Sequence, residues 1–455
     1  MAGGTPAMAV AVVGVPTNHG SKSLMNNMLY KRADWLATTN IYEVNLRQYT
    51  GEGTFNAFAK ELPRLKDMGV EVLWFMPIHP IGKKNRKGGL GSYYSVMDYK
   101  AVNPEFGSMD DLKALVKMAH GMGMKVIIDW VANHAAWDNA WTKDHPGYFE
   151  RDEQGNFKPP YDWDDVIQID HSNPAQQDAM IDAMKFWVSG INIDGFRADL
   201  AHLTPLDFWK KARKEIEPLK PGLFWLAETE EINYHEVFDA SYAWAWMHKT
   251  EDLFKGTTDP DGLCQLLQKY QDDFPASAYR MYFTSNHDEN TWNGTEYEKY
   301  GDMALALAVF CFTWNGIPMI YSGQEMPNKK RLKFFEKDAI AWNGNYALHD
   351  FYKTLLALKK NNPALRAADN AVSTRYVGTT AGKNILAWLR KKENDEVLVL
   401  LNLCKEKNGF AIADELVTGS YINVFSKAEN HFTADTFFDM QPWEFLVFEK
   451  NNKSV

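Results

Sequence analysis

The sequence is poor in cysteine and has no apolar run long enough to cross a membrane. Only three of its 455 residues are cysteines, and their wide spacing excludes a disulfide framework or a paired-cysteine metal site. The apolar segment at residues 7–15 falls well short of the about 20 residues that a membrane helix needs. The net charge of −10 gives no support for a nucleic-acid partner, which requires clustered Lys and Arg.

The first 36 residues are expected to form an N-terminal arm. Residues 7–15 resemble the core of a signal peptide, but no Lys or Arg precedes them and no clear small-x-small cleavage site follows. A replaced leader, an expression remnant and an ordinary arm all fit this pattern, and we favour the arm. The compartment stays open, with a periplasmic or secreted setting slightly favoured over the cytoplasm.

From about residue 40, short apolar runs alternate with longer segments of helical spacing. This order predicts parallel strands joined by crossover helices. Eight strands over about 320 residues predict a (β/α)8 TIM barrel. The predicted strands are 41–46, 70–76, 125–129, 193–197, 223–227, 237–240, 281–284 and 318–321, and residues 55–68 are predicted to form one helix after the first of them.

The length of the chain favours one large domain and one smaller one. We expect the barrel over residues 37–366, with a loop-insertion domain B at about 134–174 after the third strand. That insertion is rich in Asp, Trp, Pro and Gly and shows no helical period. Alternating segments after Pro363 predict a C-terminal antiparallel β-sandwich at 367–455, where Trp388 and Trp443 could bind sugar but a stabilising role is favoured.

Three acidic residues each follow a short apolar run that is typical of a buried strand. They are Asp199, Glu228 and Asp288. The carboxyl ends of barrel strands converge on one face, so these side chains are expected to meet there. Two carboxylates that flank one sugar oxygen are what glycoside hydrolysis needs, so the sequence predicts a glycosidase.

Four motifs in order resemble the α-amylase family, glycoside hydrolase family 13. They are Asp-Trp-Val-Ala-Asn-His at 129–134, Gly-Phe-Arg-Ala-Asp at 195–199, Ala-Glu at 227–228 and Asn-His-Asp at 286–288. The stretches at 91–99 and 103–107 are also similar to that family. The resemblance covers roughly residues 40–365, and each of the four motifs lies at a predicted strand end.

The resemblance implies a role for each site residue. Asp199 would be the nucleophile, Glu228 the general acid and then base, and Asp288 the third carboxylate, which holds the sugar hydroxyls. Arg197, on the same strand face as Asp199, would keep that carboxylate ionised. The resemblance also implies that Tyr94, His134 and His287 bind substrate, and His202 is a further candidate substrate-binding residue. Asp129 is expected to support Arg197 or a neighbouring loop.

Two departures from the family pattern limit what the resemblance implies. His202 and Leu203 stand where α-amylases place Lys and His, so the leaving-group side of the cleft is altered. Asn133 matches a calcium ligand, but Gln168 stands where the family has an Asp. Calcium favours carboxylate oxygens, and Asp164, Asp165 or Asp170 could compensate. A calcium ion is therefore left open, and no organic cofactor is expected.

The expected function is retaining hydrolysis of α-1,4-glucosidic bonds in starch or maltodextrins. An alternative within the family is a cyclodextrin- or pullulan-degrading enzyme or a 4-α-glucanotransferase, which the altered residues 202 and 203 motivate. A non-catalytic glucan-binding protein is a remote alternative, because all three acids are present. The expected partner is an α-glucan, without nucleic acid and without a membrane span.

Overall fold

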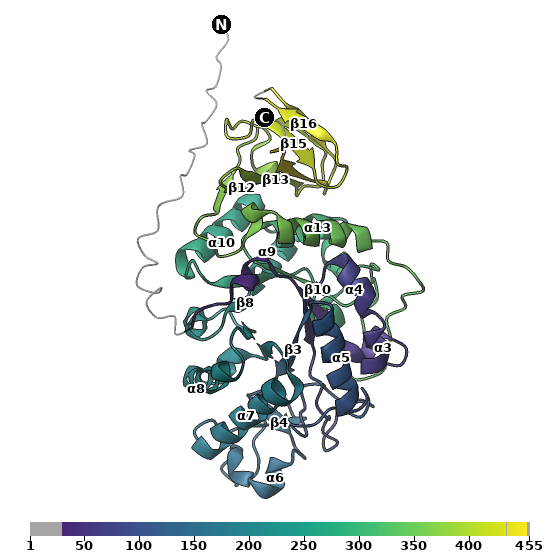
Figure 1. Cartoon of the computed structure of the whole chain (residues 1–455), viewed down its shortest axis with the longest axis vertical. Coiled ribbons are helices and arrows are strands. Elements are labelled where there is room, and N and C mark those ends of the chain that lie inside the picture. Colours follow the sequence, from purple (N-terminus) through teal and green to yellow (C-terminus); the bar gives the residue numbers. More distant parts are fainter. Residues whose placement is uncertain (1–29, 434, 453–455) are drawn as a thin grey trace.

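The computed structural model describes residues 30–433 and 435–452, and its centre is a closed barrel of parallel strands (Figure 1). Around the barrel the strand order is β1-β10-β9-β8-β7-β6-β3-β2, which confirms the predicted (β/α)8 architecture. The strands are β1 (Ile41–Val44), β2 (Val72–Phe75), β3 (Lys125–Trp130), β6 (Gly195–Ala198), β7 (Phe224–Ala227), β8 (Ala240–Tyr242), β9 (Tyr279–Tyr282) and β10 (Ile317–Tyr321).

Most helices of the described chain surround the barrel and bury apolar side chains against it, whereas the short helix in the insertion after β3 buries none of its residues. They are α2 (Leu46–Tyr49), α3 (Phe55–Ala59), α4 (Leu62–Met68), α5 (Met109–Gly121), α6 (Trp141–Asp144), α7 (Pro174–Phe186), α8 (Leu206–Ile216), α9 (Trp244–Lys255), α10 (Pro260–Asp273), α11 (Glu296–Tyr300), α12 (Met303–Thr313) and α13 (His349–Asn361). Within the described part of the chain, none of them has the length and apolar character needed to span a membrane.

Two predicted elements differ from the structure. The helix predicted at 55–68 is wrong as one element, since α3 ends at Ala59 and α4 begins at Leu62. Pro63 accounts for the break, because its ring would clash with the carbonyl four residues earlier. The strand predicted at 237–240 begins only at Ala240. The backbone N–H of Trp225 donates to the Asp239 carboxylate, so it is not available to a backbone carbonyl of an earlier start of this strand.

Gly195 lets β6 lie close against β7. Its φ is +152°, and a Cβ at this position would be 1.9 Å from the carbonyl oxygen of Phe224. Any side chain would therefore separate the two strands. Since β6 and β7 lead directly to Asp199 and Glu228, this glycine sets the spacing of the two acids.

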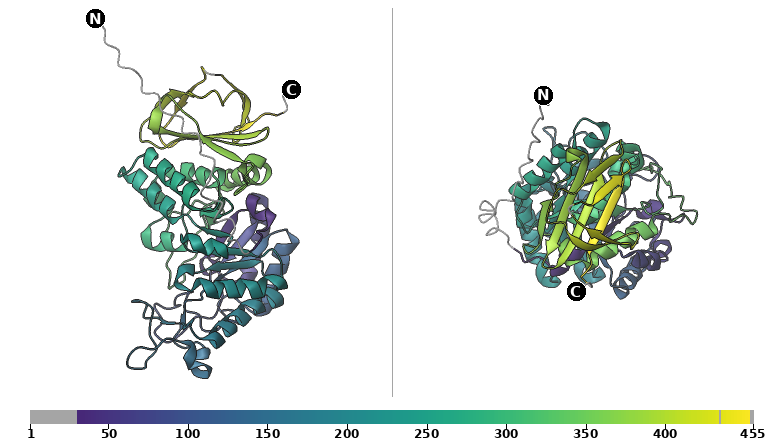
Figure 2. Two further views of the ribbon diagram at one scale, coloured as in Figure 1. Left: turned by 90° about the vertical axis from the view of Figure 1, so that its left-hand side faces the viewer. Right: turned by 90° about the horizontal axis from the view of Figure 1, so that it is seen from above.

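The chain leaves the barrel after β3 and forms a small antiparallel ribbon within the predicted insertion at 134–174. In this ribbon β4 (His134–Ala136) pairs with β5 (Val166–Gln168), with His134 opposite Gln168. The region of β4 and α6 lies at one end of the molecule's long axis, and the C-terminal strands lie at the other (Figures 1 and 2).

The C-terminal region is an antiparallel sheet of order β11-β12-β13-β18-β15-β16 with a β14–β17 pair, which confirms the predicted β fold. Side chains from both sheets share one apolar core. The strands are β11 (Ser373–Tyr376), β12 (Ile385–Lys392), β13 (Asp395–Asn402), β14 (Asn408–Ala411), β15 (Gly419–Asn423), β16 (Glu429–Phe432), β17 (Phe437–Met440) and β18 (Phe445–Lys450).

The two tryptophans considered as sugar platforms in this region pack against the barrel. Trp388 is fully buried against Phe310 and Trp314, at ring-centroid distances of 5.4 Å from each. Trp443 packs on Phe254 at 5.7 Å. Trp388 therefore holds the sheet to α12 and cannot stack on a sugar. Most of the predicted N-terminal arm, residues 1–36, lies outside the described residues.

Candidate active site

The three predicted acids all lie beyond the carboxyl ends of barrel strands. Asp199 directly follows β6 and Glu228 directly follows β7, which is the neighbouring strand. These two residues are only 7% and 6% exposed. Asp288 lies six residues past the end of β9, and its side chain is 42% exposed. The fold thus brings the acids to one face of the barrel, with two of them deeply buried.

Arg197 connects the buried carboxylates through its guanidinium group. Its Nη1 donates to Asp199 Oδ1 at 2.9 Å and to Asp129 Oδ1 at 3.0 Å. Its Nη2 lies 2.9 Å from Glu228 Oε2, and its Nε donates to the Tyr242 hydroxyl at 3.0 Å. One cation therefore serves three carboxylates, so the cluster carries an excess of negative charge that favours retention of a proton.

Burial and mutual repulsion shift the pKa values of this cluster. Burial raises the pKa of Glu228, with Arg197 opposing the rise and the negative charges of Asp199 and Asp288 adding to it. Burial likewise raises the pKa of Asp199, again against the effect of Arg197. For Asp129 the same combination gives a pKa of about 7. These environments favour a protonated carboxyl in the cluster near neutral pH, as a general acid requires.

His287 lies between two acidic side chains. Its Nδ1 is 2.5 Å from Glu43 Oε1, and its Nε2 is 3.3 Å from Asp288 Oδ2. Burial lowers the pKa of His287, but the charges of Asp288 and Glu43 outweigh that effect and raise it well above its usual range. Burial raises the pKa of Asp288, but the His287 charge brings it below its ordinary value.

Tyr94 contacts both the Arg197 cluster, through Asp129, and His287. Its hydroxyl donates to Asp129 Oδ2 at 2.9 Å and lies 2.9 Å from His287 Nε2. The tyrosine ring stacks on the His287 ring at 5.4 Å with an interplanar angle of 21°. Since a protonated His287 donates from both nitrogens, the tyrosine accepts from His287 and donates to Asp129.

His134 lies at the start of β4 and is held by its neighbour. Asn133 Nδ2 is 3.2 Å from His134 Nδ1, and the His134 ring meets Trp163 edge-on at 5.6 Å. Burial lowers the pKa of His134 to about 4. The imidazole is therefore neutral near pH 7, with Nδ1 accepting from Asn133 and the hydrogen on Nε2.

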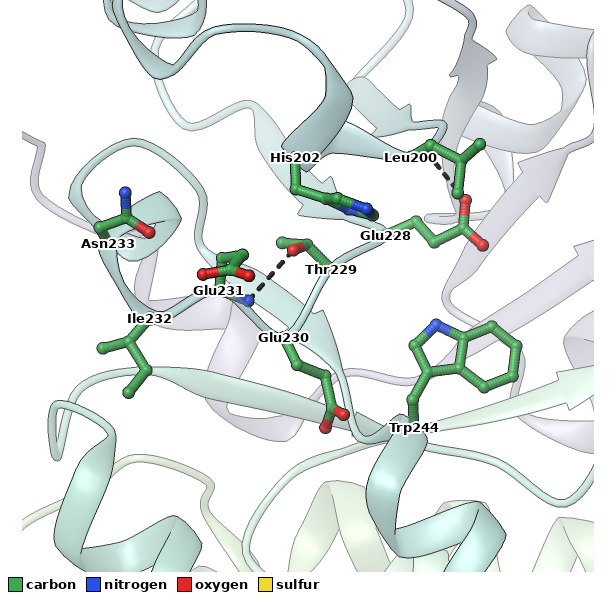
Figure 3. Close-up of a pocket in the computed structure, with 9 residues that line it drawn as sticks. All are labelled: Leu200, His202, Glu228, Thr229, Glu230, Glu231, Ile232, Asn233 and Trp244. Atoms are coloured by element: carbon green, nitrogen blue, oxygen red, sulfur yellow. Dashed lines mark hydrogen bonds between the residues drawn. The ribbon is translucent and has the colours of Figure 1, made fainter. Parts of the chain in front are cut away.

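A cavity of about 610 Å³ opens beside Glu228 (Figure 3). His202, in the short helix η4 (Ala201–Leu203), faces it together with an indole ring. The lining residues are Leu200, His202, Glu228, Thr229, Glu230, Glu231, Ile232, Asn233 and Trp244. Of the predicted site residues, His202 and Glu228 line this cavity.

Leu200 links the acid residues through its backbone. Its φ of +39° is in the left-handed region, which side chains other than glycine rarely adopt. In this conformation its N–H donates to Glu228 Oε2 at 2.8 Å. Oε2 therefore accepts from both Leu200 and Arg197, so the proton of the acid form must lie on Oε1.

Several site residues were not predicted from the sequence. Glu43 gave the clearest signal, because a carboxylate inside an apolar strand needs a buried partner. Trp74 donates its indole N–H to Asp129 Oδ2 at 3.1 Å, but its position in an apolar run is equally typical of core packing. Tyr242 and Trp244 gave no signal, since they occur in an aromatic-rich stretch without a matching motif.

The residues predicted for calcium do not form a cage of free oxygens. Gln168 Nε2 donates to the backbone and side-chain oxygens of Asn133. Asp164 and Asp165 pair with Lys87 at 3.0 and 3.3 Å, and Asp170 Oδ1 accepts from Ser172. Over residues 30–433 and 435–452, no three or more His, Cys, Asp or Glu side chains are grouped so as to hold a metal ion. This arrangement does not fit a calcium site.

Comparison with known proteins places these features in a family. A sequence model of the α-amylase catalytic domain matches residues 37–166 and 152–394. α-Amylase MalA of Haloarcula japonica is 25% identical over 449 residues, which cover 93% of this chain and 65% of that protein. A cyclomaltodextrin glucanotransferase of Geobacillus stearothermophilus is 28% identical over 418 residues, covering 80% of this chain and 56% of that enzyme. The chain thus spans less than two thirds of these two relatives.

A solved structure gives a closer match in length. A noncanonic maltogenic α-amylase from Thermotoga neapolitana superposes with a TM-score of 0.84 at 29% identity. The match covers 91% of this chain and 99% of that one.

Proposed function

Because the chain belongs to the α-amylase family of glycoside hydrolases, we propose that it hydrolyses α-1,4-glucosidic bonds of starch or maltodextrins with retention of configuration. The observation that carries this proposal is the bridge from Arg197 to both Asp199 and Glu228. A guanidinium shared between two carboxylates keeps them near each other, as the separation of about 5 Å in retaining enzymes requires.

In the first step Asp199 attacks the anomeric carbon as Glu228 protonates the leaving oxygen. The bond from the anomeric carbon to the glycosidic oxygen breaks, and an ester bond to Asp199 forms. Arg197 stabilises the Asp199 carboxylate before attack. The proton comes from Glu228 Oε1, since Oε2 already accepts from Leu200 and Arg197.

In the second step Glu228, now ionised, takes a proton from water as that water attacks the anomeric carbon. The ester bond to Asp199 breaks, which restores both side chains and releases a sugar of the original configuration. The raised pKa of Glu228 suits its role as the acid in the first step, because its acid form persists to higher pH than that of an exposed glutamate.

The remaining residues would hold the sugar ring on the non-reducing side of the cut. Asp288 and His287 would bind ring hydroxyls, and the Tyr94 ring would cover an apolar sugar face. The imidazole ring of His287 is fixed because it pairs with both Glu43 and Asp288. The Asp288 carboxylate is still partly exposed, so it would be available to the substrate. The neutral His134 would donate a hydrogen bond from Nε2.

A second candidate function is transfer of the glycosyl group to another sugar. The cavity beside Glu228 supports it, because Trp244 and Ile232 there offer apolar surface where an acceptor sugar would bind. His202 stands in this cavity in place of the lysine found in family members. Such a surface would let a sugar compete with water for the ester intermediate.

A product time course on soluble starch, β-cyclodextrin, pullulan and maltotriose tests the proposal. The expected result is early release of mixed maltooligosaccharides from starch by the parent protein. Glu228→Gln keeps the shape of the side chain but cannot donate the proton, so its rate should fall about 100- to 10,000-fold. Full activity of Asp199→Asn would contradict the assigned nucleophile.

The same products separate the alternatives. Rapid cyclodextrin or pullulan cleavage with slow attack on starch would favour a specialised debranching or ring-opening activity. Products longer than maltotriose from maltotriose would establish transfer, and in that case Trp244→Ala should shift the ratio toward hydrolysis. Sugar binding by the parent without any turnover would favour a non-catalytic glucan-binding protein.

A further inference from the structure

We propose that the side-chain amide of Gln168 replaces a divalent cation at the junction between the barrel and the β4–β5 ribbon, and that it positions Asn133 and His134. The part of the proposal that concerns the junction is argued from the contacts of Gln168 and does not depend on the proposed function. The consequence for His134 rests on the proposed function, because it matters only where this site binds a sugar.

Three oxygen atoms converge on the nitrogen of the Gln168 side chain. Nε2 is 2.9 Å from the Asn133 backbone oxygen, 3.0 Å from Asn133 Oδ1 and 3.3 Å from the Ile169 backbone oxygen. Only the NH2 group of the amide can face three acceptors, since the amide oxygen would repel them. A calcium ion would gather the same kind of neutral oxygens, but at 2.3–2.6 Å. The amide nitrogen thus occupies the point on which a cation's ligands would converge.

The acceptor capacity of the Asn133 carbonyl is already used. Besides the Gln168 amide, it accepts the backbone N–H of Ile169 at 3.1 Å. A carbonyl oxygen has two lone pairs, so both are engaged. A cation here would have to displace the amide and would then be left with a mostly neutral ligand set.

Nearby carboxylates do not supply the missing charge. Asp164 and Asp165 are paired with Lys87, and Asp170 accepts from the backbone N–H and hydroxyl of Ser172. Recruiting any of them would break an existing ion pair or turn. The two N–H groups of the amide are directed at these oxygens and add no charge.

The backbone of Gln168 is fixed on both sides. It pairs with His134 across the ribbon, its N–H donates to the Lys158 carbonyl at 2.8 Å, and its carbonyl accepts from Glu150 at 3.0 Å. The Gln168 side chain therefore extends from a fixed strand. It connects Asn133, in the loop after β3, to the rest of the insertion. A bound ion would make the same connection.

The amide also sets which group His134 offers to a sugar. Because Asn133 Oδ1 accepts from Gln168, Asn133 Nδ2 must point toward His134 Nδ1, at 3.2 Å. Nδ1 is then an acceptor and the hydrogen lies on Nε2. Gln168 is thus a positioning residue that acts through Asn133.

Calcium titration and thermal unfolding of the whole protein test this inference. Calorimetric titration of the parent with CaCl2 should show no stoichiometric binding, and its Tm should be the same in EDTA and in millimolar CaCl2. Gln168→Glu removes the N–H donors and sets a carboxylate against three oxygens. This variant should lose Tm in EDTA and regain it with calcium, and its KM for maltooligosaccharides should rise and recover in parallel.

Gln177→Glu is the matched control. Gln177 Nε2 also donates to a backbone carbonyl, that of His171 at 2.6 Å, and within residues 30–433 and 435–452 this is its one hydrogen-bond acceptor. Its variant should show no recovery with calcium. A merely structural role of Gln168 would change Tm without a parallel change in KM.

Loss of parent Tm in EDTA with recovery in calcium, or stoichiometric calcium binding by the parent, would overturn the inference. So would a Gln168→Glu variant as stable in EDTA as the parent. If Gln168→Glu fails to fold, the parent measurements alone decide. A parent without turnover on any α-glucan would defeat the proposed function, whereas the calorimetric result would still decide the role of the amide.

Discussion

At the scale of single residues, the site depends on a few buried charges that neutralise one another incompletely. Arg197 faces three carboxylates, and His287 faces two more. Removing a partner from such a buried set leaves an uncompensated charge, which costs more than the pair itself contributes. Glu43 and Asp129 therefore influence the protonation of the groups beside them.

Glu43→Gln tests this control at His287. Removing the Glu43 charge should lower the pKa of His287 and reduce the free energy of unfolding by about 3 kcal/mol. A histidine whose folded pKa is raised contributes stability that is complete below its unfolded pKa and is lost as pH rises through its folded pKa. The stability difference between parent and variant should thus shrink at alkaline pH.

Nuclear magnetic resonance titration of the His287 ring protons, assigned with His287→Asn, measures the shift directly. Glu153→Gln changes an exposed residue of the insertion between β4 and β5, so it is a suitable control and should change neither quantity. An unchanged titration of His287 in Glu43→Gln would contradict the charge-pair explanation.

At the scale of elements, Asp199 and Glu228 are placed by one close strand contact. β6 and β7 run side by side in register, with Gly195 opposite Phe224 and Ala198 opposite Ala227. A change in the separation of these strands would move both carboxylates relative to Arg197. The glycine is thus a requirement of the site as well as of the barrel.

Gly195→Ala should destabilise the protein strongly, because its Cβ would overlap the Phe224 carbonyl oxygen. We expect a loss of more than about 4 kcal/mol in urea unfolding or a failure to fold. Gly121→Ala, at the end of α5, meets no atom within 4 Å and should be neutral or stabilise by up to about 1 kcal/mol. Comparable stability of the two variants would contradict the predicted clash.

Elements with a strong local pattern could be predicted from the sequence, and those set by distant contacts could not. All eight barrel strands overlap their predicted positions because most of them are short, largely apolar runs bounded by turns. The break between α3 and α4 was missed although Pro63 signals it, because the apolar spacing continues across it. β8 starts late because of the Asp239 side chain, whose partner lies on another strand.

The same distinction holds for the site. Asp199, Glu228 and Asp288 were found because each ends a recognisable motif, and the fold gathers them as expected. Glu43 and His287 are 244 residues apart in the chain, so their pairing depends on closure of the barrel. The role of Gln168 was open for a similar reason, since only the folded ribbon brings its amide to Asn133.

At the scale of the whole molecule, the C-terminal sheet and the barrel share one apolar contact. Trp388 is part of this contact and is fully buried against Phe310 of α12. Buried apolar side chains of both regions belong to one continuous cluster. Continuity of this kind favours unfolding of the two regions together.

Trp388→Ala should therefore destabilise the entire protein and not the sheet alone. Truncation of a buried tryptophan typically costs about 3–5 kcal/mol. Differential scanning calorimetry should show one transition in the parent and a single transition at lower temperature in the variant. Phe437→Ala, at a side chain that is 67% exposed, should leave Tm almost unchanged. Two separate transitions in the parent would show that the regions unfold independently.

The Gln168 amide has a consequence that follows from mass action. A bound ion stabilises a fold by an amount that depends on its free concentration, so dilution or competing chelators weaken the link. A side chain attached to the chain cannot be diluted away, and its contribution is the same at every ambient ion level. With the amide in place, the joint between barrel and ribbon holds equally well in phosphate-rich, chelator-rich or calcium-poor surroundings.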